Sequence, residues 1–282
     1  MPRPGLETVA TVSALRAALA APRSASIRIA LVPTMGALHD GHVSLVREAR
    51  ARADFVVASI FVNPAQFAPH EDFDAYPRTL EADLEKLAGQ ADVVFTPTAR
   101  EMYPDGYATG ITVGGPSAGL ESDFRPHFFS GVATVVAKLL LAAAPDIALF
   151  GEKDYQQLLV VKRLVRDLAL PVEIVGVPTL READGLAMSS RNAYLSAEER
   201  KTAGRLNAVL KEAASRARAT GDLRAAEASA IEALWAAGFS HVDYVAIRDA
   251  ESLDHIAALE QPARILAAVK IGKTRLIDNM AV

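Results

Sequence analysis

The sequence predicts an α/β fold, in which a Rossmann-like, doubly wound parallel sheet is followed by a smaller α+β domain. Apolar, β-branched runs alternate with helical patterns through much of the chain, which is typical of βαβ units. One of these runs, residues 55–62, is continuously apolar, as expected for a strand buried on both faces of a parallel sheet. Beyond residue 190 the pattern changes to long helical stretches rich in Ala, Arg and Glu. We therefore expect a Rossmann-like domain over residues 1–184 and a smaller C-terminal lid domain over residues 185–282.

Local patterns predict the elements of the parallel part. A first amphipathic helix at residues 11–19 should end before Pro22, since proline interrupts helices. Strands are expected at residues 27–32, 55–62, 92–95, 146–150 and 172–177, and further helices at residues 43–49, 79–87, 131–144 and 155–168. Residues 102–129 are rich in glycine and proline and should form an irregular excursion over the sheet, a kind of loop that is often functional.

The C-terminal part has its own signals. Ser196 and Glu199 form a capping-box pattern, which predicts a long helix that ends near residue 219, before Gly221. A second helix should run through Trp235, and strand-like runs follow at residues 241–247 and 264–271.

Composition excludes several function classes. The chain of 282 residues has a formal net charge of −4 and a pI near 5.9, which predicts no surface for nucleic acid or for an anionic membrane. Because the chain has no cysteine, it has no disulfides, no thiolate nucleophile and no thiolate zinc site, and we expect a reducing, cytoplasmic environment. Residues 1–11 lack the pattern of a signal peptide, and the apolar segment 132–144 is too short to span a bilayer.

The most informative stretch is Val-Pro-Thr-Met-Gly-Ala-Leu-His-Asp-Gly-His at residues 32–42, where a strand should turn into a helix. A helix N-terminus at this point would offer N–H groups and a partial positive charge to a phosphate. Gly36 and Gly41 would let a ligand approach the backbone, and His39 and His42 fall on one face of the first helical turn. Two imidazoles there can donate to phosphate oxygens. The pair alone would also fit two solvated surface histidines.

Further polar clusters follow other predicted strands, and ligands of open α/β sheets bind outside the carboxyl ends of the strands. Lys153 offers a charge for phosphate, Asp154 can cap a helix or help to hold a cation, and Arg191 can bind phosphate oxygens in a bidentate way. Each cluster alone would also fit an ordinary polar turn or surface loop. Together they predict one pocket at this edge of the sheet, formed with the first motif by Asn63, Gln66, Gly151, Lys153, Asp154, Gln157, Met188, Ser189, Ser190 and Arg191.

These motifs resemble those of the nucleotidylyl-transferase superfamily, whose adenylate-forming members carry His-x-Gly-His after the first strand. The lead-in Pro-Thr-Met-Gly-Ala-Leu-His narrows the resemblance to the pantoate:β-alanine ligase family. The resemblance extends through Gly-Leu-Ala-Met-Ser-Ser-Arg-Asn at residues 185–192 to Thr-Arg-Leu-Ile-Asp-Asn at residues 274–279. Two departures, Asp40 where many relatives have Glu and Leu180 where Val is common, remove no functional group.

The resemblance implies an ATP-dependent ligase that condenses pantoate with β-alanine through a pantoyl adenylate and releases AMP and pyrophosphate. It implies Mg²⁺ with the ATP, no assigned protein ligand for the metal, and a homodimer whose other partners are small molecules rather than nucleic acid or membrane. The loop at residues 188–191 should close on the triphosphate. The resemblance assigns catalysis to His39, His42, Lys153 and Arg191, substrate binding to Asn63, Gln66 and Gln157, and ATP binding to Met35, Gly36, Ala37, Leu38, His39, Asp40, Gly41, His42, Gly151, Glu152, Lys153, Asp154, Leu180, Met188, Ser189, Ser190 and Arg191.

Two other functions remain open at this point. Another nucleotidylyltransferase of the superfamily would share the two histidines, and a non-catalytic nucleotide-binding module would share the glycines. The sequence contains no Walker A loop, no Gly-x-Gly-x-x-Gly after a strand, no Gly-x-Ser-x-Gly and no His-Glu-x-x-His, so kinase, dehydrogenase, hydrolase and zinc-protease functions lose their usual signatures. The roles of Asp83, Arg125 and His127 are left open.

Overall fold

A computed structural model describes residues 5–68, 71 and 73–282, so the first four residues of the N-terminal stretch lie outside the described residues. The chain forms two compact units. Unit 1 comprises Met1–Gly114, Arg125–Glu152 and Val160–Pro178, and unit 2 comprises Gly115–Phe124, Lys153–Leu159 and Thr179–Val282. Each unit is described by itself. The expected domain division after residue 184 stays a prediction.

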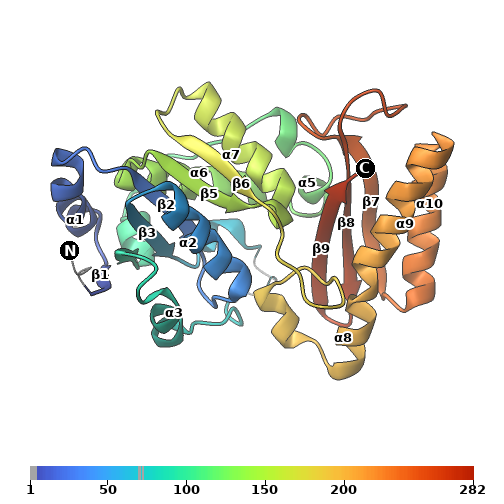
Figure 1. The fold of residues 1–282 in the computed structure, drawn as a ribbon, viewed down its shortest axis with the longest axis horizontal. Coiled ribbons are helices and arrows are strands. Elements are labelled where there is room, and N and C mark those ends of the chain that lie inside the picture. The colour runs from blue at the N-terminus through green and yellow to red at the C-terminus, as the bar shows by residue number, and fades with distance from the viewer. Residues whose placement is uncertain (1–4, 69–70, 72) are drawn as a thin grey trace. The chain divides into compact units, whose positions relative to one another are not determined.

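Unit 1 is built on a parallel sheet, as predicted (Figure 1). Its described strands lie in the order β1-β4-β3-β2-β5-β6, with β2 (Ile29–Thr34) in a central position beside β3 (Phe55–Ile60) and β5 (Ile147–Gly151). β4 (Val93–Phe95) and β6 (Glu173–Val177) flank these three strands. Since all the pairings are parallel, the carboxyl ends of β2, β3 and β5 lie at one edge of the sheet.

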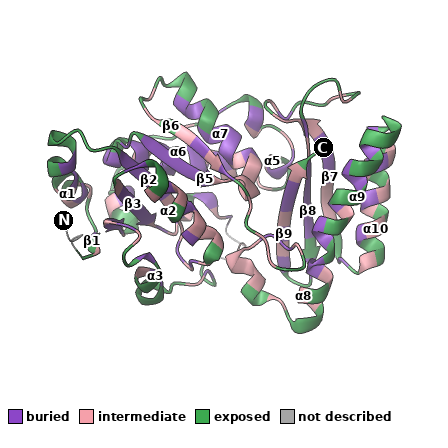
Figure 2. Ribbon diagram, viewed as in Figure 1, coloured by how far each residue is buried: buried purple, intermediate pink, exposed green. Residues whose placement is uncertain are grey.

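Helices cover both faces of this sheet. α2 (Asp40–Arg52) and α3 (Leu80–Leu87) share a core with Val32, Val56 and Leu149 on one face. The alternate strand residues, such as Leu31 and Val57, are equally buried on the other face, where α6 (Phe128–Ala143) packs on β2. Figure 2 shows these strands as buried along their length, in agreement with their apolar sequences. α1 (Val12–Ser24) packs on α6, and α7 (Tyr155–Asp167) connects β5 to β6.

One prediction about unit 1 was wrong, and one strand was not predicted. α1 does not end before Pro22 but continues to Ser24, with Pro22 buried inside its last turn. The missing proline N–H costs little there, because the helix ends two residues later. The N-terminal stretch also contains a short strand that the sequence did not reveal, β1 (Glu7–Val9), which pairs with β4 at the edge of the sheet.

The excursion after β4 is largely irregular, as expected. It contains only the short helices α4 (Ala99–Met102) and α5 (Glu121–Phe124) and the 3-10 turn η2 (Gly115–Ser117) among the described residues. α6 follows it and begins at Phe128, three residues before the start predicted at residue 131.

Unit 2 contains an antiparallel sheet of β7 (His241–Asp249), β8 (Ala263–Ile271) and β9 (Thr274–Ala281). α9 (Arg205–Thr220) and α10 (Leu223–Ala237) pack on one face, where every second residue of β8, such as Ile265 and Val269, is buried. The predicted capping box at Ser196 is present, but the helix that it opens, α8 (Ala197–Ala203), is separated from α9 at Gly204. β9 was not predicted from the sequence, because its residues are unusually polar for a buried strand.

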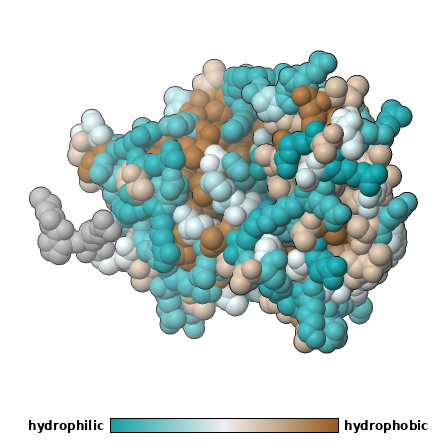
Figure 3. Space-filling view, turned by 45° about the vertical axis from the view of Figure 1, so that its right-hand side comes forward, coloured by the Kyte–Doolittle hydropathy of each residue, from teal (hydrophilic) through white to brown (hydrophobic). Residues whose placement is uncertain are grey.

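The described part of the chain contains no helix of the length and apolarity that a membrane span requires. The face drawn in Figure 3 is mostly hydrophilic, with hydrophobic side chains in small groups between the polar ones.

Candidate functional site

The loop between β2 and α2 has a backbone that few sequences can adopt. Gly36 and Ala37 both have positive φ, at 82° and 49°. A Cβ on Gly36 would lie 3.1 Å from both Asp83 Oδ2 and Ile60 Cγ2, so glycine fits here for space as well as for conformation. The left-handed conformation of Ala37 must be held by its surroundings, because it is strained for a residue with a side chain.

Asp83 on α3 supplies that support. Its carboxylate accepts the N–H groups of Ala37 at 2.9 Å and Leu38 at 2.7 Å, and the Thr79 hydroxyl lies 3.3 Å from Oδ1. The carboxylate is completely buried. From the next turn of the same helix, Lys86 Nζ donates to the Leu38 carbonyl oxygen at 2.5 Å. α3 therefore holds both polar groups of Leu38, the residue immediately before His39.

His39 and His42 cap the start of α2 reciprocally. His39 is the N-cap residue, and its Nδ1 accepts the Gly41 N–H at 3.1 Å. His42 Nδ1 accepts the His39 N–H at 3.3 Å, and the two ring centroids lie 4.1 Å apart. An imidazole nitrogen that accepts a hydrogen bond carries no proton, so each neutral ring has its proton on Nε2.

This arrangement changes the expected way of binding phosphate. The sequence predicts free backbone N–H groups at the start of α2. In the structure, the N–H groups of Ala37, Leu38, His39 and Gly41 donate to side chains, and that of His42 donates to the His39 carbonyl. Because Nδ1 of each ring accepts a hydrogen bond, the donor of each neutral imidazole is its Nε2–H. The imidazole side chains, more than these five N–H groups, are thus suited to meet an anion.

The 3-10 turn η1 (Pro64–Gln66) follows β3, after Asn63. The amide of Asn63 is almost fully buried, and all of its hydrogen-bonding capacity is used inside unit 1. Its Nδ2 donates to Gln66 Oε1 at 3.1 Å and to the Gly131 carbonyl at 3.2 Å. Its Oδ1 accepts the Tyr103 hydroxyl at 2.7 Å and the Ala65 N–H at 3.3 Å. Asn63 is thus a partner of Gln66.

Gln66 connects η1 to the loop after β2. Its side chain is buried, and Nε2 lies 3.1 Å from the sulfur of Met35, the first residue after β2. The predicted substrate amide and the predicted ATP loop are therefore in direct contact at the carboxyl edge of β2 and β3.

Arg125, whose role was left open, supports the same turn. Its guanidinium donates to both carboxylate oxygens of Glu71 at 2.7 Å and to the Gln66 carbonyl at 3.1 Å, and it lies over the Phe128 ring at 3.9 Å. Burial alone would raise the pKa of Glu71, but its hydrogen bonds and ion pair with Arg125 outweigh burial and lower it.

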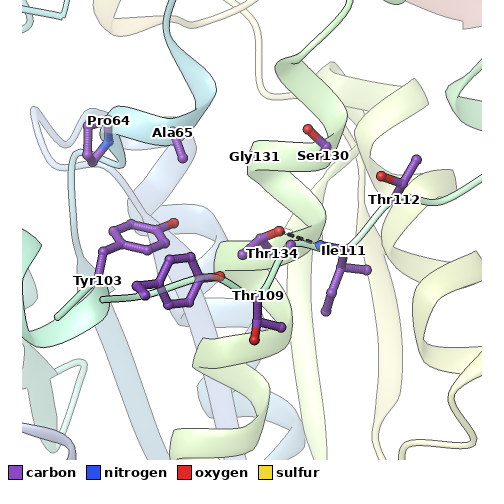
Figure 4. Close-up of a pocket in the computed structure, with 11 residues that line it drawn as sticks. Pro64, Ala65, Tyr103, Thr109, Ile111, Thr112, Ser130, Gly131 and Thr134 are labelled. Carbon is purple, nitrogen blue, oxygen red and sulfur yellow. Dashed lines mark hydrogen bonds between the residues drawn. The ribbon is translucent and has the colours of Figure 1, made fainter. Parts of the chain in front are cut away.

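An open cavity is lined in part by η1 (Figure 4). Its volume is about 640 Å³, and Pro64 and Ala65 lie on its wall together with Tyr103, Tyr107 and Thr134. The Thr134 hydroxyl accepts the Ile111 N–H at 2.9 Å, the contact drawn in Figure 4, and so ties the irregular segment after Tyr107 to α6.

In unit 2, Lys153 lies in the turn η3 (Glu152–Asp154) and is held by its main chain. Its carbonyl accepts Asn279 Nδ2 at 2.8 Å, and Asn279 Oδ1 accepts Arg264 Nε at 2.6 Å. The Arg264 guanidinium in turn lies over the Tyr155 ring at 3.7 Å. Lys153 Nζ is 3.8 Å from Asp154 Oδ2, with the carboxylate partly exposed.

The two neighbouring glutamines at the start of α7 have different surroundings. Gln156 is buried, and its amide is bonded to the carbonyls of Pro116 and Gly119 and to the Glu121 N–H, so it has a structural role. Gln157, the predicted substrate ligand, is only partly buried.

The segment that contains Met188 is a small hairpin. Arg181 and Ala187 form an antiparallel bridge, Met188 donates its N–H to the Leu180 carbonyl, and Ser189 caps the turn η4 (Ser190–Tyr194). Arg181 makes a bidentate ion pair with the buried Asp278 of β9, at 2.8 and 2.9 Å.

β9 therefore holds both predicted ATP segments of unit 2, through Asp278 on one face and Asn279 on the other. A third β9 residue, Arg275, bonds both oxygens of Glu121 at 2.7 and 2.8 Å and Asp243 at 2.6 Å. Burial acts against its charge, yet these carboxylates raise the pKa of Arg275 above its ordinary value. Burial, with the charge of Glu121, also raises the pKa of Tyr244 well above its ordinary value.

The side chains of the site offer few ligands for the Mg²⁺ that the resemblance implies. Among the described residues there is no group of three or more His, Asp or Glu side chains that could hold a metal ion alone. Mg²⁺ usually binds through one or two carboxylates together with substrate phosphates and water, and the partly exposed Asp154 fits that mode beside Lys153.

The predicted site residues thus fall into two groups. In unit 1, Met35, Asn63 and Gln66 form one bonded set, and the loop of Met35 leads into His39 and His42. In unit 2, Lys153 and the hairpin of Met188 are both anchored on β9. Tyr103, Arg181 and Asn279 were not predicted to support the site, and the role of Asp83 was left open.

Comparisons with known proteins agree with the motifs. The family "Pantoate-beta-alanine ligase" matches residues 7–281 of the chain. The pantothenate synthetase of Mesorhizobium japonicum is 58% identical over 283 residues, covering 100% of this chain and 99% of that protein. The pantothenate synthetase of Caulobacter vibrioides is 56% identical, covering 97% of this chain and 98% of that protein.

Solved structures show the same similarity. The crystal structure of pantothenate synthetase from Thermus thermophilus superposes with a TM-score of 0.91 at 51% identity, over 97% of this chain and 98% of that one. The crystal structure of the pantoate–β-alanine ligase of Francisella tularensis, complexed with βγ-ATP and β-alanine, superposes with a TM-score of 0.82. The two chains are 34% identical, and the match covers 98% of this chain and 97% of that one. The chain therefore belongs to the pantoate–β-alanine ligase family and is an ATP-dependent ligase that condenses pantoate with β-alanine.

Proposed function

We propose that this ligase first converts pantoate to an enzyme-bound pantoyl adenylate. A pantoate carboxylate oxygen attacks the α-phosphorus of ATP, and the bond to the bridging oxygen breaks to release pyrophosphate. The β-alanine amine then attacks the acyl carbon of the mixed anhydride, loses a proton, and AMP leaves with the electrons of the C–O bond. The observation that carries the proposal is the contact between Gln66 and Met35, because the first step needs pantoate beside the α-phosphate.

In this proposal the residues of unit 1 orient the nucleophile and meet the phosphates. A carboxylate is a weak nucleophile, so its rate of attack depends on how well it is held in line. Gln66 is assigned to pantoate. His39 and His42 are assigned to the phosphates as Nε2–H donors, an assignment that their capping geometry supports.

The residues of unit 2 are assigned to the triphosphate and to the second glutamine contact. Lys153 offers a point charge, and Ser189, Ser190 and Arg191 offer hydroxyl and guanidinium donors for phosphate oxygens. Gln157 is assigned to pantoate. Closure of the hairpin around Met188 would keep water from the adenylate, which hydrolyses readily.

The proposal also includes Mg²⁺, the cellular location and the oligomeric state. ATP is used as its Mg²⁺ complex, in which the metal neutralises phosphate charge, and Asp154 is the side chain suited to assist. We also propose that the enzyme acts in the cytoplasm as a homodimer, with the mass of the complex in sedimentation as the measurement that decides the oligomeric state.

Isotope transfer tests the adenylate directly. With pantoate labelled by ¹⁸O in its carboxylate, one labelled oxygen should appear in the phosphate of AMP for each pantothenate formed. Pyrophosphate should be released with pantoate and ATP alone, before β-alanine is added. Formation of ADP, or AMP without label, would contradict the adenylate pathway.

A further inference from the structure

The orientation of the Asn63 amide is fixed by a main-chain carbonyl. The Gly131 carbonyl oxygen can only accept a hydrogen bond, so the group that faces it at 3.2 Å must be the NH₂ of Asn63. The approach is close because residue 131 has no side chain: a Cβ there would overlap the Ala65 carbonyl and lie 2.9 Å from Gln66 Cα. Asn63 Oδ1 therefore faces Tyr103 and the Ala65 N–H.

The orientation of the Asn63 amide determines that of the Gln66 amide. The second N–H of Asn63 Nδ2 donates to Gln66 Oε1 at 3.1 Å, so the NH₂ of Gln66 must point the other way, toward Met35. The three side chains thus form a relay with one direction: the Tyr103 hydroxyl donates to Asn63, Asn63 donates to Gln66, and Gln66 presents its NH₂ beside the loop after β2.

Tyr103 is a dependable donor at the start of this relay. Burial and the neighbouring Tyr107 raise the pKa of its hydroxyl to about 12, so the hydroxyl keeps its proton at any pH at which the enzyme works. Its ring is held by Tyr107, with centroids 5.0 Å apart in an edge-to-face arrangement, and by Lys138, whose Nζ lies 5.8 Å from the ring centroid. Figure 4 shows Tyr103 at the wall of the cavity below Pro64 and Ala65.

We propose that Asn63 and Tyr103 are positioning residues that hold the NH₂ end of the Gln66 amide toward pantoate. The inference rests on the proposed function, since it needs Gln66 to bind pantoate. An amide NH₂ attracts a carboxylate, whereas the amide oxygen repels it. A reversed Gln66 would therefore lose one hydrogen bond to pantoate and add a repulsion. Asn63 then acts on the substrate through Gln66, which agrees with the complete use of its amide inside the protein.

The Tyr103→Phe variant removes only the hydroxyl that starts the relay. Pantoate affinity, measured by calorimetry in the presence of a non-hydrolysable ATP analogue, should fall about tenfold, the size of one lost buried hydrogen bond. The affinity for the ATP analogue alone should change less than about twofold. Tyr107→Phe is the matched control, because its ring borders the same cavity while its hydroxyl is not part of the relay.

A double mutant separates positioning from general damage. If Tyr103 acts through Gln66, then Tyr103→Phe should have almost no further effect on pantoate affinity in a Gln66→Ala background. Equal effects in both backgrounds would overturn the inference, and so would unchanged pantoate affinity in Tyr103→Phe or equal losses for pantoate and the ATP analogue. Failure of the proposed function would look different, since the wild-type enzyme would then form ADP, or AMP without the ¹⁸O label of pantoate.

Discussion

The two histidines at the start of α2 show how a single residue can have both a structural and a chemical role. Each ring uses Nδ1 to cap the helix, which fixes Nε2 as the protonated nitrogen of the neutral form. A substitution therefore removes a donor and a cap together. The two effects can be separated, because a lost cap lowers stability whereas a lost donor lowers rate.

For His42→Ala we expect pantoate-dependent pyrophosphate release to slow by about 10²–10³-fold, as for the loss of one donor to developing charge. Loss of the bond to the His39 N–H should lower the free energy of unfolding by only about 1 kcal/mol. Single-turnover pyrophosphate release and urea unfolding measure the two. His42→Asn offers an amide in place of the imidazole and should regain more stability than rate. A His42→Ala enzyme with near-normal pyrophosphate release would contradict the assignment.

The raised pKa of Tyr103 predicts how the stability of the protein changes at alkaline pH. Its pKa is about 12 in the fold and about 10 in the unfolded chain, so the unfolded state loses the proton first and becomes relatively more stable as pH rises. The stabilisation from the Tyr103 hydroxyl is thus fully present below pH 10 and is lost between about pH 10 and 12. Urea unfolding at pH 9 and pH 11 should show that the destabilisation by Tyr103→Phe shrinks at the higher pH. A constant difference between the two proteins would contradict this reasoning.

At the scale of elements, α3 matters to the site although none of its side chains was assigned to a substrate. Asp83→Asn should disrupt the loop after β2, because an amide can accept only one of the two N–H groups and presents its own NH₂ to the other. We expect a loss of about 1–3 kcal/mol in unfolding free energy and a weaker affinity for ATP. Glu85→Gln, an exposed change on the same helix, is the control. Unchanged ATP affinity in Asp83→Asn would show that the loop does not depend on this support.

In unit 2, β9 supports Lys153 as α3 supports the loop after β2, and this support can be tested. Asn279→Ala removes the bond to the Lys153 carbonyl and the partner of Arg264 Nε, so Lys153 should be less well placed and ATP affinity should fall several-fold. Because the effect is expected to pass through Lys153, it should largely disappear in a Lys153→Ala background. Calorimetry with an ATP analogue on the four proteins measures the coupling. Additive losses would mean that Asn279 acts by another route.

The same elements show what could be predicted from the sequence. Strands β2, β3 and β5 and the helices between them were found because their apolar periodicity is local. β9 was missed because its polar residues are paired with distant partners, as Arg275 is with Glu121, 154 positions away. β1 was missed because three residues at a sheet edge carry almost no pattern. The end of α1 was misplaced because a proline near a helix terminus costs little.

The residues of the site likewise divide into those that could be predicted from the sequence and those that could not. His39, Gln66 and Lys153 lie in short contiguous motifs that can be recognised in the sequence. Their supports are remote: Asp83 is 45 positions from Leu38, Tyr103 is 40 from Asn63, and Asn279 is 126 from Lys153. No local pattern distinguishes these contacts, so they follow only from the tertiary fold.

At the scale of the whole molecule, the proposed reaction needs groups from both units. His39 and His42 belong to unit 1, and Lys153 and Arg191 belong to unit 2, so ATP bound as proposed should protect both units from hydrogen exchange. With Mg·ATP we expect slower exchange over residues 35–42 and over residues 188–194, and pantoate should extend the protection to residues 63–66. Lys153→Ala should reduce the protection over residues 188–194 more than that over residues 35–42, because the triphosphate then loses a contact of unit 2. Residues 223–237 of α10 serve as an internal control, since none of them is assigned to a ligand. Protection confined to one unit would show that the two groups of residues do not act on the same ATP molecule, and the assignment of the other unit to the triphosphate would then have to be abandoned.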